Sequence, residues 1–319
     1  MQDEPEIESV MPKITYSNRL PPLLKLLMNL TAFQAWITGS LRDSESMKRR
    51  VRLGFDGSVT DDVIQYDRAG SGHYTKIASE LLKNTDLKGK EVLDVGCGTG
   101  ILSRLVLERG AKKLDSGDLS AYMLGQWRRK AAAQGYTQDQ VAFHQIDSEC
   151  LPFDENRFDV VVSSMMLGMV PDQKKALAEM KRVLRPGGVL ALSTQGPELY
   201  YEGTLASTVA ALKSFSVEMM AYRLEFWTLN ERGIKRALKQ VGFRDIRTNR
   251  LTWQDDFEST DKAYEFVAST SSMWWFGKLK PEKIPRMAHK IRETYKRRGV
   301  TKITQDVTFA YAAKPAVSP

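Results

Sequence analysis

The stretch Glu91-Val-Leu-Asp-Val-Gly-Cys-Gly-Thr-Gly-Ile-Leu-Ser103 decides the fold of this chain, because a short apolar run passes into three glycines at alternate positions. This pattern predicts a strand, a tight loop and the start of a helix. Glycine tolerates a positive φ and has no Cβ, so the loop can approach a ligand where the next helix presents free N–H groups. The stretch therefore predicts a nucleotide-like ligand.

The glycine spacing narrows the choice of ligand, because the third glycine comes one residue earlier than in the dinucleotide fingerprint G-x-G-x-x-G. Asp94 would repel a pyrophosphate but attract, directly or through water, the ammonium group of an amino-acid-bearing nucleoside. That ligand is S-adenosylmethionine, and Asp94-x-Gly96-x-Gly98-x-Gly100 resembles the first motif of the class I methyltransferases. The resemblance implies that Asp94, Gly96, Cys97, Gly98 and Gly100 bind this cofactor. A purely structural turn between strand and helix is the alternative.

Residues 112 to 120 predict a second strand that ends in an acid, Asp118, 18 residues beyond Gly100. At this position a carboxylate can accept hydrogen bonds from both hydroxyls of an adenosine ribose. The alternative is a solvated turn aspartate or a helix N-cap, although Ser120 fills the cap role equally well. Leu119 and Met123 would lie near the adenine, or be ordinary core residues.

The third predicted strand, Val141-Ala-Phe-His-Gln-Ile-Asp147, resembles the family's third motif. In that motif the acid ending the strand accepts the exocyclic amino group of adenine, and the next backbone N–H meets a ring nitrogen. The resemblance thus assigns Asp147 and Ser148 to the nucleoside pocket. His144 is interpreted as a packed strand histidine rather than a catalyst.

The fourth predicted strand, 156 to 164, is a near-continuous apolar run typical of a central parallel strand. Ser163, near its end, is counted among the cofactor-binding residues. The following residues contain neither an Asn/Asp-Pro-Pro-Tyr/Phe tetrapeptide for gripping a planar amino group nor a Pro-Cys dipeptide for cytosine chemistry. Met169 stands where many relatives have a histidine, which removes an obvious general base. A methionine-lined wall suits an apolar substrate, with plain core packing as the alternative.

The segment before the glycine loop offers two candidates for a base, His73 and Tyr66. In the methyltransferases that this sequence resembles, a Tyr-Asp segment at this distance folds over the methionine end of the cofactor. Tyr66 could equally pack its ring against the sheet, and packing is the favoured interpretation for Tyr74. Residues 41–72 are interpreted as a polar connector leading into a helix at about 73–84.

The remaining pattern completes an α/β fold: a Rossmann-like, seven-stranded, mostly parallel sheet with an antiparallel last strand, helices on both faces and added helical cap segments. Pro186-Gly-Gly188 predicts a reversal into the fifth strand. Residues 1–65 are interpreted as an N-terminal helical extension or lid, and 66–319 as the methyltransferase domain. The other expected elements are a helix at 172–184, a helix after Asn230 that ends at Gly242, strands near 244–251 and 305–313, and aromatic-rich cap insertions at about 196–227 and 252–303.

Composition sets broader limits. The chain has 319 residues, a formal charge of +8 and two cysteines, so a disulfide framework is implausible and a cytoplasmic location is expected. The acidic start lacks the features of a targeting signal. Residues 20–38 form an amphipathic pattern that could pack as a lid or touch a membrane surface, helped by Lys48, Arg49, Arg50 and Arg52. No metal-ligand pattern is present, and oligomeric state is not indicated.

Three short segments in succession resemble the small-molecule branch that includes quinone and sterol methyltransferases: Leu-Pro-Phe153, Phe158-Asp-x-Val and Leu184-Arg-Pro-Gly-Gly188. The resemblance implies in-line transfer of a methyl group to an O, N, C or S atom of a small, partly apolar acceptor. Nucleic-acid methylation is the first alternative; the basic charge favours it, whereas the missing base-gripping motifs do not. A protein that binds the cofactor without catalysis is the second.

Overall fold

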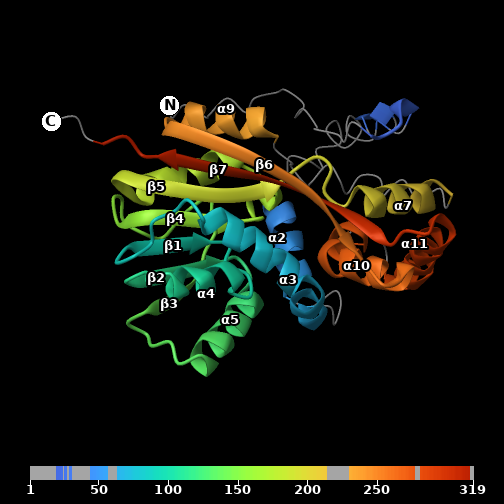
Figure 1. The fold of residues 1–319 in the computed structure, drawn as a ribbon, viewed down its shortest axis with the longest axis horizontal. Helices are drawn as coiled ribbons and strands as arrows, with labels where there is room; N and C mark the ends of the chain where they lie inside the picture. The colour runs from blue at the N-terminus through green and yellow to red at the C-terminus, as the bar shows by residue number, and fades with distance from the viewer. Residues whose placement is uncertain are drawn as a thin grey trace, which may run out of the picture.

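The computed structural model describes residues 19–23, 25–26, 29–30, 44–56, 63–213, 230–276 and 281–316. Their centre is a seven-stranded sheet in the order β3-β2-β1-β4-β5-β7-β6 (Figure 1). The first five strands in chain order run parallel, and β7 is antiparallel to both of its neighbours. The fold class predicted from the sequence is thus confirmed. The strands are β1 (Glu91–Val95), β2 (Lys113–Asp118), β3 (Val141–Gln145), β4 (Phe158–Ser164), β5 (Leu184–Gln195), β6 (Arg244–Asp256) and β7 (Lys302–Ala313).

Helices cover both faces of the sheet because neighbouring strand residues point to opposite sides. Val92 belongs to the core shared with α3 (Val63–Leu82), α4 (Ile101–Glu108) and α5 (Ala121–Ala133). Leu93 belongs to the second core, shared with α6 (Gln173–Val183) and α9 (Glu231–Val241). Both residues are fully buried, so β1 lies at the centre of the fold and carries the glycine loop at its carboxyl end.

The interpretation of residues 41–72 as a connector is wrong. Two helices lie there, α2 (Ser44–Phe55) and the first part of α3, which begins at Val63 rather than at about 73. Glycines and charges suggested a loop, but packing overrides such local propensities. Met47 of α2 and Ile77 of α3 are both buried, so each helix has an apolar contact that offsets its polar composition.

The predicted ends of α9 are confirmed, and the predicted Pro-Gly-Gly reversal takes a different form. Asn230 caps α9 by accepting a hydrogen bond from the Gly233 N–H at 2.8 Å, and Gly242 ends the helix with φ of 87°. The Pro-Gly-Gly segment lies within β5, where Gly187 has φ of 78° and the pairing register with β4 shifts. The predicted reversal is therefore an irregularity inside a strand, because backbone pairing continues on both sides of it.

The cap segments form a helical layer at one end of the sheet. Figure 1 shows α7 (Tyr201–Leu212), α10 (Thr260–Phe276) and α11 (Ile284–Arg298) gathered at the right, where β6 and β7 run on beyond the other strands. A short turn of 3-10 helix, η3 (Pro281–Lys283), precedes α11. Tyr264 and Tyr295 pack edge to face in this layer, with ring centroids 5.6 Å apart. Residues 214–229 of the predicted cap lie outside the described part of the chain.

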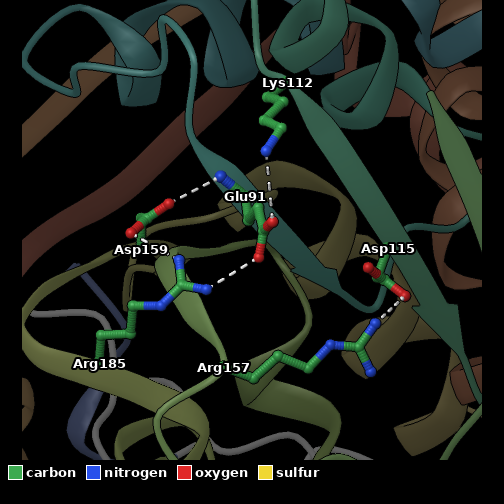
Figure 2. Close-up of polar contacts among 6 residues, drawn as sticks. All are labelled: Glu91, Lys112, Asp115, Arg157, Asp159 and Arg185. Carbon is green, nitrogen blue, oxygen red and sulfur yellow. Dashed lines mark hydrogen bonds and ion pairs between the residues drawn. The ribbon is translucent and has the colours of Figure 1, made fainter. Parts of the chain in front are cut away.

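The amino ends of the strands are joined by charged side chains (Figure 2). Arg185, at the start of β5, donates to Asp159 Oδ1 at 2.7 Å and to Glu91 Oε2 at 2.9 Å. Asp159 Oδ2 in turn accepts the Glu91 backbone N–H at 2.9 Å. This cluster links β1, β4 and β5 at the edge opposite the glycine loop, so the loop edge is left for other contacts.

Within the described residues, no helix has the length and apolar character needed to span a membrane.

Candidate functional site

The glycine loop after β1 is shaped by three positive φ angles, 79° at Gly96, 53° at Gly98 and 87° at Gly100. A Cβ built on Gly96 would lie 2.4 Å from Met166 Cγ, and one on Gly100 would lie 2.1 Å from the Trp127 ring. A Cβ on Gly98 would meet nothing within 4 Å. The outer glycines are therefore required by packing and by backbone conformation, whereas Gly98 faces the cavity that its backbone lines.

Asp118 at the end of β2 binds directly to this loop. Its Oδ2 accepts the Gly98 N–H at 2.8 Å, and its Oδ1 accepts the Ser120 N–H at 2.9 Å. Burial raises the pKa of Asp118, whereas the hydrogen bonds from these two N–H groups lower it by a smaller amount. Ser120 itself caps α5 by accepting the Met123 N–H at 3.1 Å, as the sequence suggested. Asp118, Leu119 and Met123 all line the cavity, and each carboxylate oxygen keeps a second lone pair for a ligand hydroxyl.

Asp94 lies behind the loop rather than on the cavity wall. Its Oδ2 accepts the Ser103 Oγ–H at 2.7 Å, and Ser103 continues to Ser116 Oγ at 2.9 Å, which accepts the Trp127 Nε1–H at 3.1 Å. Among the residues that the structure describes, none donates to Asp94 Oδ1. Burial raises the pKa of Asp94 to about 7, opposed by the Ser103 hydrogen bond and assisted by the negative charge of Asp118. This buried network ties β1, β2, α4 and α5 together beneath the loop.

Asp147, assigned to the adenine edge, lines the cavity together with Ser148. Its Oδ1 accepts the Glu149 N–H at 2.9 Å, and its Oδ2 lies 2.7 Å from the ammonium group of Lys48. The same ammonium lies 2.7 Å from Glu149 Oε2. Burial disfavours the charge of Lys48, but the bonds to Asp147 and Glu149 outweigh this and raise its pKa. The sequence had placed Lys48 in a basic run near a membrane surface, and no local pattern linked it to β3.

Helix α2 covers this end of the cavity. Val51 and Phe55 line the cavity beside Lys48, and Asp56, just after the helix, accepts the Ser120 Oγ–H at 2.5 Å. The helix thus touches the ends of both β2 and β3. Its sequence position, some 40 residues before the glycine loop, gave no signal of this placement.

The residues after β4 form an apolar wall of the same cavity. Met165, with the strained φ of 58°, has its carbonyl bound by Gln195 Nε2 at 2.5 Å, and Gln195 itself lines the cavity. A positive φ at a bulky residue costs energy that surrounding contacts must offset, so this turn fixes where the methionines point. The remaining wall residues are Tyr74, Ser164, Met166, Met169, Val170, Pro171, Leu199, Tyr200, Thr204 and Val267.

Several predicted site residues are not among those that line the cavity. Cys97 is buried in the core, and burial raises the pKa of its thiol. Ser163 is also buried and donates to the Val95 carbonyl at 2.7 Å, so Ser164 takes its place at the cavity. The backbone of Tyr66 lies in α3, but its side chain is outside the described part of the structure. His144 fits the packing interpretation, with Nε2 2.7 Å from Asp115 Oδ1.

His73 is buried one layer behind the cavity wall. Its Nδ1 lies 3.6 Å from Asp255 Oδ2. Burial raises the pKa of Asp255, but the contact with His73 lowers it, and the net pKa lies below the ordinary value. The imidazole is surrounded by aromatic rings, of which those of Tyr74 and Tyr200 belong to residues that line the cavity. The other two rings are Trp253 and Phe266. A catalytic role for His73 stays a prediction.

The chain is similar to known methyltransferases. A family described as "Methyltransferase domain" matches residues 93–192. Malonyl-[acyl-carrier protein] O-methyltransferase of Salmonella typhimurium is 32% identical over 208 residues, which are 65% of this chain and 75% of that protein. Ubiquinone/menaquinone biosynthesis C-methyltransferase UbiE of Francisella tularensis is 30% identical over 187 residues, 54% and 74% of the two chains.

Longer relatives and solved structures agree. The bifunctional biotin biosynthesis protein BioHC of Saccharophagus degradans is 32% identical over 204 residues, 64% of this chain, and the match spans about a third (34%) of that protein's length. Phosphoethanolamine N-methyltransferase 2 of Haemonchus contortus, solved with phosphomonomethylethanolamine and S-adenosylhomocysteine, superposes with a TM-score of 0.53 at 17% identity, covering 83% of this chain and 60% of that chain. At that identity the likeness establishes the fold alone.

Proposed function

The chain belongs to the class I S-adenosylmethionine-dependent methyltransferases, and from this premise we propose that it transfers the cofactor's methyl group to a small, partly apolar acceptor by in-line displacement. The observation that carries the proposal is one cavity with a lining of two kinds. One part of the lining is the glycine loop, Asp118 and Asp147; the other is the apolar wall after β4, which we call the methionine wall. A polar nucleoside and an apolar acceptor would meet between them.

The residues present fit S-adenosylmethionine. Gly98 leaves room where a Cβ would intrude, and Asp118 and Asp147 offer acceptor oxygens at the ends of adjacent strands. Asp94 Oδ1 is a buried acceptor that no described residue satisfies, which suits a nearby ammonium group reached through water. When bound, the cofactor supplies an electrophilic methyl group on a sulfonium sulfur. Leu119 and Met123 would contribute apolar contact to the adenine.

The chain's contribution to the reaction is alignment and exclusion of water. Met166 packs against Gly96 of the loop, and Met165 is held by Gln195, so the acceptor wall is attached to the cofactor loop. Holding two reactants at near-attack distance in a dry site can lower the activation free energy by about 7–11 kcal/mol. Few catalytic side chains are then needed.

If the acceptor must lose a proton, His73 and Tyr66 are the proposed bases; His73, which lies behind the cavity wall, would receive the proton through a residue of that wall. His73→Gln should lower turnover about a hundredfold and remove a step from its pH profile, because a positioned base contributes roughly that much. His289→Gln, on the exposed face of α11, is the matched control. Turnover and a pH profile unchanged in His73→Gln would remove His73 from the mechanism.

The names of the relatives and the apolar residues after β4 together narrow the class of acceptor. One of those names contains malonyl-[acyl-carrier protein], and another contains ubiquinone/menaquinone biosynthesis. Met169, Val170 and Pro171 would contact a ring or an alkyl chain more favourably than a charged group. We therefore rank quinols and other phenolic rings first and malonyl thioesters second.

The test begins with calorimetric titration of the protein with S-adenosylhomocysteine and, separately, with NAD. We expect binding of the former only. A methyl-transfer screen with labelled cofactor then covers quinols, sterols, phenols, amines, thiols and a malonyl thioester. Absence of affinity for S-adenosylhomocysteine would contradict the proposal; affinity without any transfer would favour the non-catalytic alternative, and salt-sensitive binding to RNA would favour the nucleic-acid alternative.

We also propose a cytoplasmic location, supported by two free cysteines, one of which, Cys150, is exposed. Contact of segment 20–38 with a membrane surface is a separate proposal, supported by the exposed side chains of Leu23, Leu26 and Leu30. Vesicle flotation of the wild type and of a Leu23→Ser/Leu26→Ser variant tests it. Equal flotation of both would contradict a contact through these leucines.

A further inference from the structure

A lysine from the N-terminal extension is inserted between two carboxylates at the nucleoside end of the cavity. Lys48 Nζ lies 2.7 Å from Asp147 Oδ2 and 2.7 Å from Glu149 Oε2, with its side chain only 14% exposed. All three residues line the cavity. Two carboxylates and one ammonium group leave a net charge of −1, and the ammonium group between the two acids offsets their mutual repulsion.

The cluster is held rigidly from the protein side. Glu149 Oε1 accepts the Asp172 N–H at 2.9 Å, and the Glu149 N–H donates to Asp147 Oδ1 at 2.9 Å. Lys48 holds the remaining oxygen of Asp147. The carboxylate is therefore fixed by one backbone donor and one charged donor, which sets its orientation toward the cavity. Glu45, the other acid near Lys48 at 3.6 Å, is exposed and contributes little.

Helix α2 carries this lysine and is attached at a second point. Asp56 accepts the Ser120 Oγ–H, and Ser120 donates its N–H to Asp118. Helix α2 thus binds Asp147 directly through Lys48, and the residue after the helix is linked to Asp118 through Ser120. Loss of the Lys48 contact alone leaves this second attachment in place, so the charge effect can be measured apart from the helix's presence.

We propose that Lys48 is a specificity-determining residue for the base of the cofactor. The inference rests on the proposed function. An ionised, fixed carboxylate at Asp147 can only accept hydrogen bonds, so it favours an exocyclic amino group and repels a carbonyl oxygen. Without the ammonium group, the negative charge of Glu149 repels Asp147 from the orientation in which it accepts the amino group, and the preference for that group is lost. Lys48 thereby makes the pocket select adenine over a 6-oxo purine.

The experiment compares S-adenosylhomocysteine with S-inosylhomocysteine, which differs at the 6-position, by calorimetric titration. The wild type should prefer the adenosyl compound by about thirtyfold or more, since a buried mismatch of this kind costs about 2 kcal/mol. Lys48→Met should weaken adenosyl binding about tenfold and reduce the preference to about threefold or less. Lys48→Arg should keep the wild-type preference. Arg52→Met, an exposed cation on the same helix, should behave like the wild type.

Equal weakening of both compounds by Lys48→Met would show a merely structural role and overturn the inference, as would unchanged binding of both. If Lys48→Met does not fold, Lys48→Met/Glu149→Gln keeps the cluster at −1 and is measured instead. In that double variant no like charge lies beside Asp147, so the adenosyl preference should be retained, and its loss would also overturn the inference. A wild type that binds neither compound would instead contradict the proposed function.

Discussion

The two ends of the parallel strands are built from the same residue types but in opposite ways. At the amino ends, Glu91, Asp159 and Arg185 bind one another, so their charges are satisfied within the protein (Figure 2). At the carboxyl ends, Asp118 and Asp147 accept backbone N–H groups and still border a cavity. The first arrangement joins strands, and the second leaves lone pairs available for a ligand.

This difference teaches where a change should affect stability and where it should affect binding. Carboxylates that border no cavity contribute to stability alone, whereas carboxylates that line the cavity can also serve a ligand. Four substitutions test the distinction.

The largest effect is expected from Gly100→Ala. The added Cβ would lie 2.1 Å from the Trp127 ring at a φ of 87°, so overpacking and backbone strain combine. We expect a loss of about 3–5 kcal/mol in the free energy of unfolding, measured by urea denaturation. Gly135→Ala, at a φ of 80° with nothing within 4 Å, is the matched control and should cost only about 1 kcal/mol. Equal losses would show that the indole contact is unimportant.

The next effect depends on pH and concerns Asp94. The unfolded carboxyl ionises near its ordinary value of 3.8, while the folded one keeps its proton until about pH 7. The folded state therefore binds more protons between these values, and the stability contributed by Asp94 falls as pH rises through this window. Asp94→Asn, which can still accept from Ser103, should gain up to about 4 kcal/mol relative to the wild type across it.

Urea denaturation of both proteins near the two limits of this window provides the measurement for Asp94. A stability difference that stays constant with pH would contradict the buried, protonated state of this carboxyl.

A third, smaller effect separates binding from folding. Asp118→Ala should weaken S-adenosylhomocysteine about thirtyfold, near 2 kcal/mol, because it removes the acceptors proposed for the ribose. Asp115→Asn, on the same strand but bound to Arg157 and His144, should leave that affinity within about twofold. Calorimetric titration gives both values. Comparable weakening in the two variants would remove the distinction between the two carboxylates.

The smallest effect is expected at the amino ends. Arg185→Met breaks the contacts to Asp159 and Glu91, but the Arg185 side chain is 39% exposed, so water screens the pairs. A loss of about 1 kcal/mol or less in unfolding free energy should result, with unchanged affinity for S-adenosylhomocysteine. A change in affinity would mean that the two ends of the sheet are coupled.

The sheet, the glycine loop and the positions of Asp118 and Asp147 could be predicted from the sequence. Successive strand–helix units return each parallel strand to the same edge, so acids that end consecutive strands are brought together by local chain geometry. The cap signals at Ser120, Asn230 and Gly242 were also readable, because each acts within a few residues.

Only the tertiary structure decided the rest. It placed Lys48 between Asp147 and Glu149, Asp94 behind the loop, and His73 one layer away from the cavity. It also turned the expected connector at 41–72 into two helices. The physical reason is that these contacts join segments about 100 or more residues apart, or depend on which face of a helix is buried. Packing between distant elements sets such contacts, and local spacing carries no record of them.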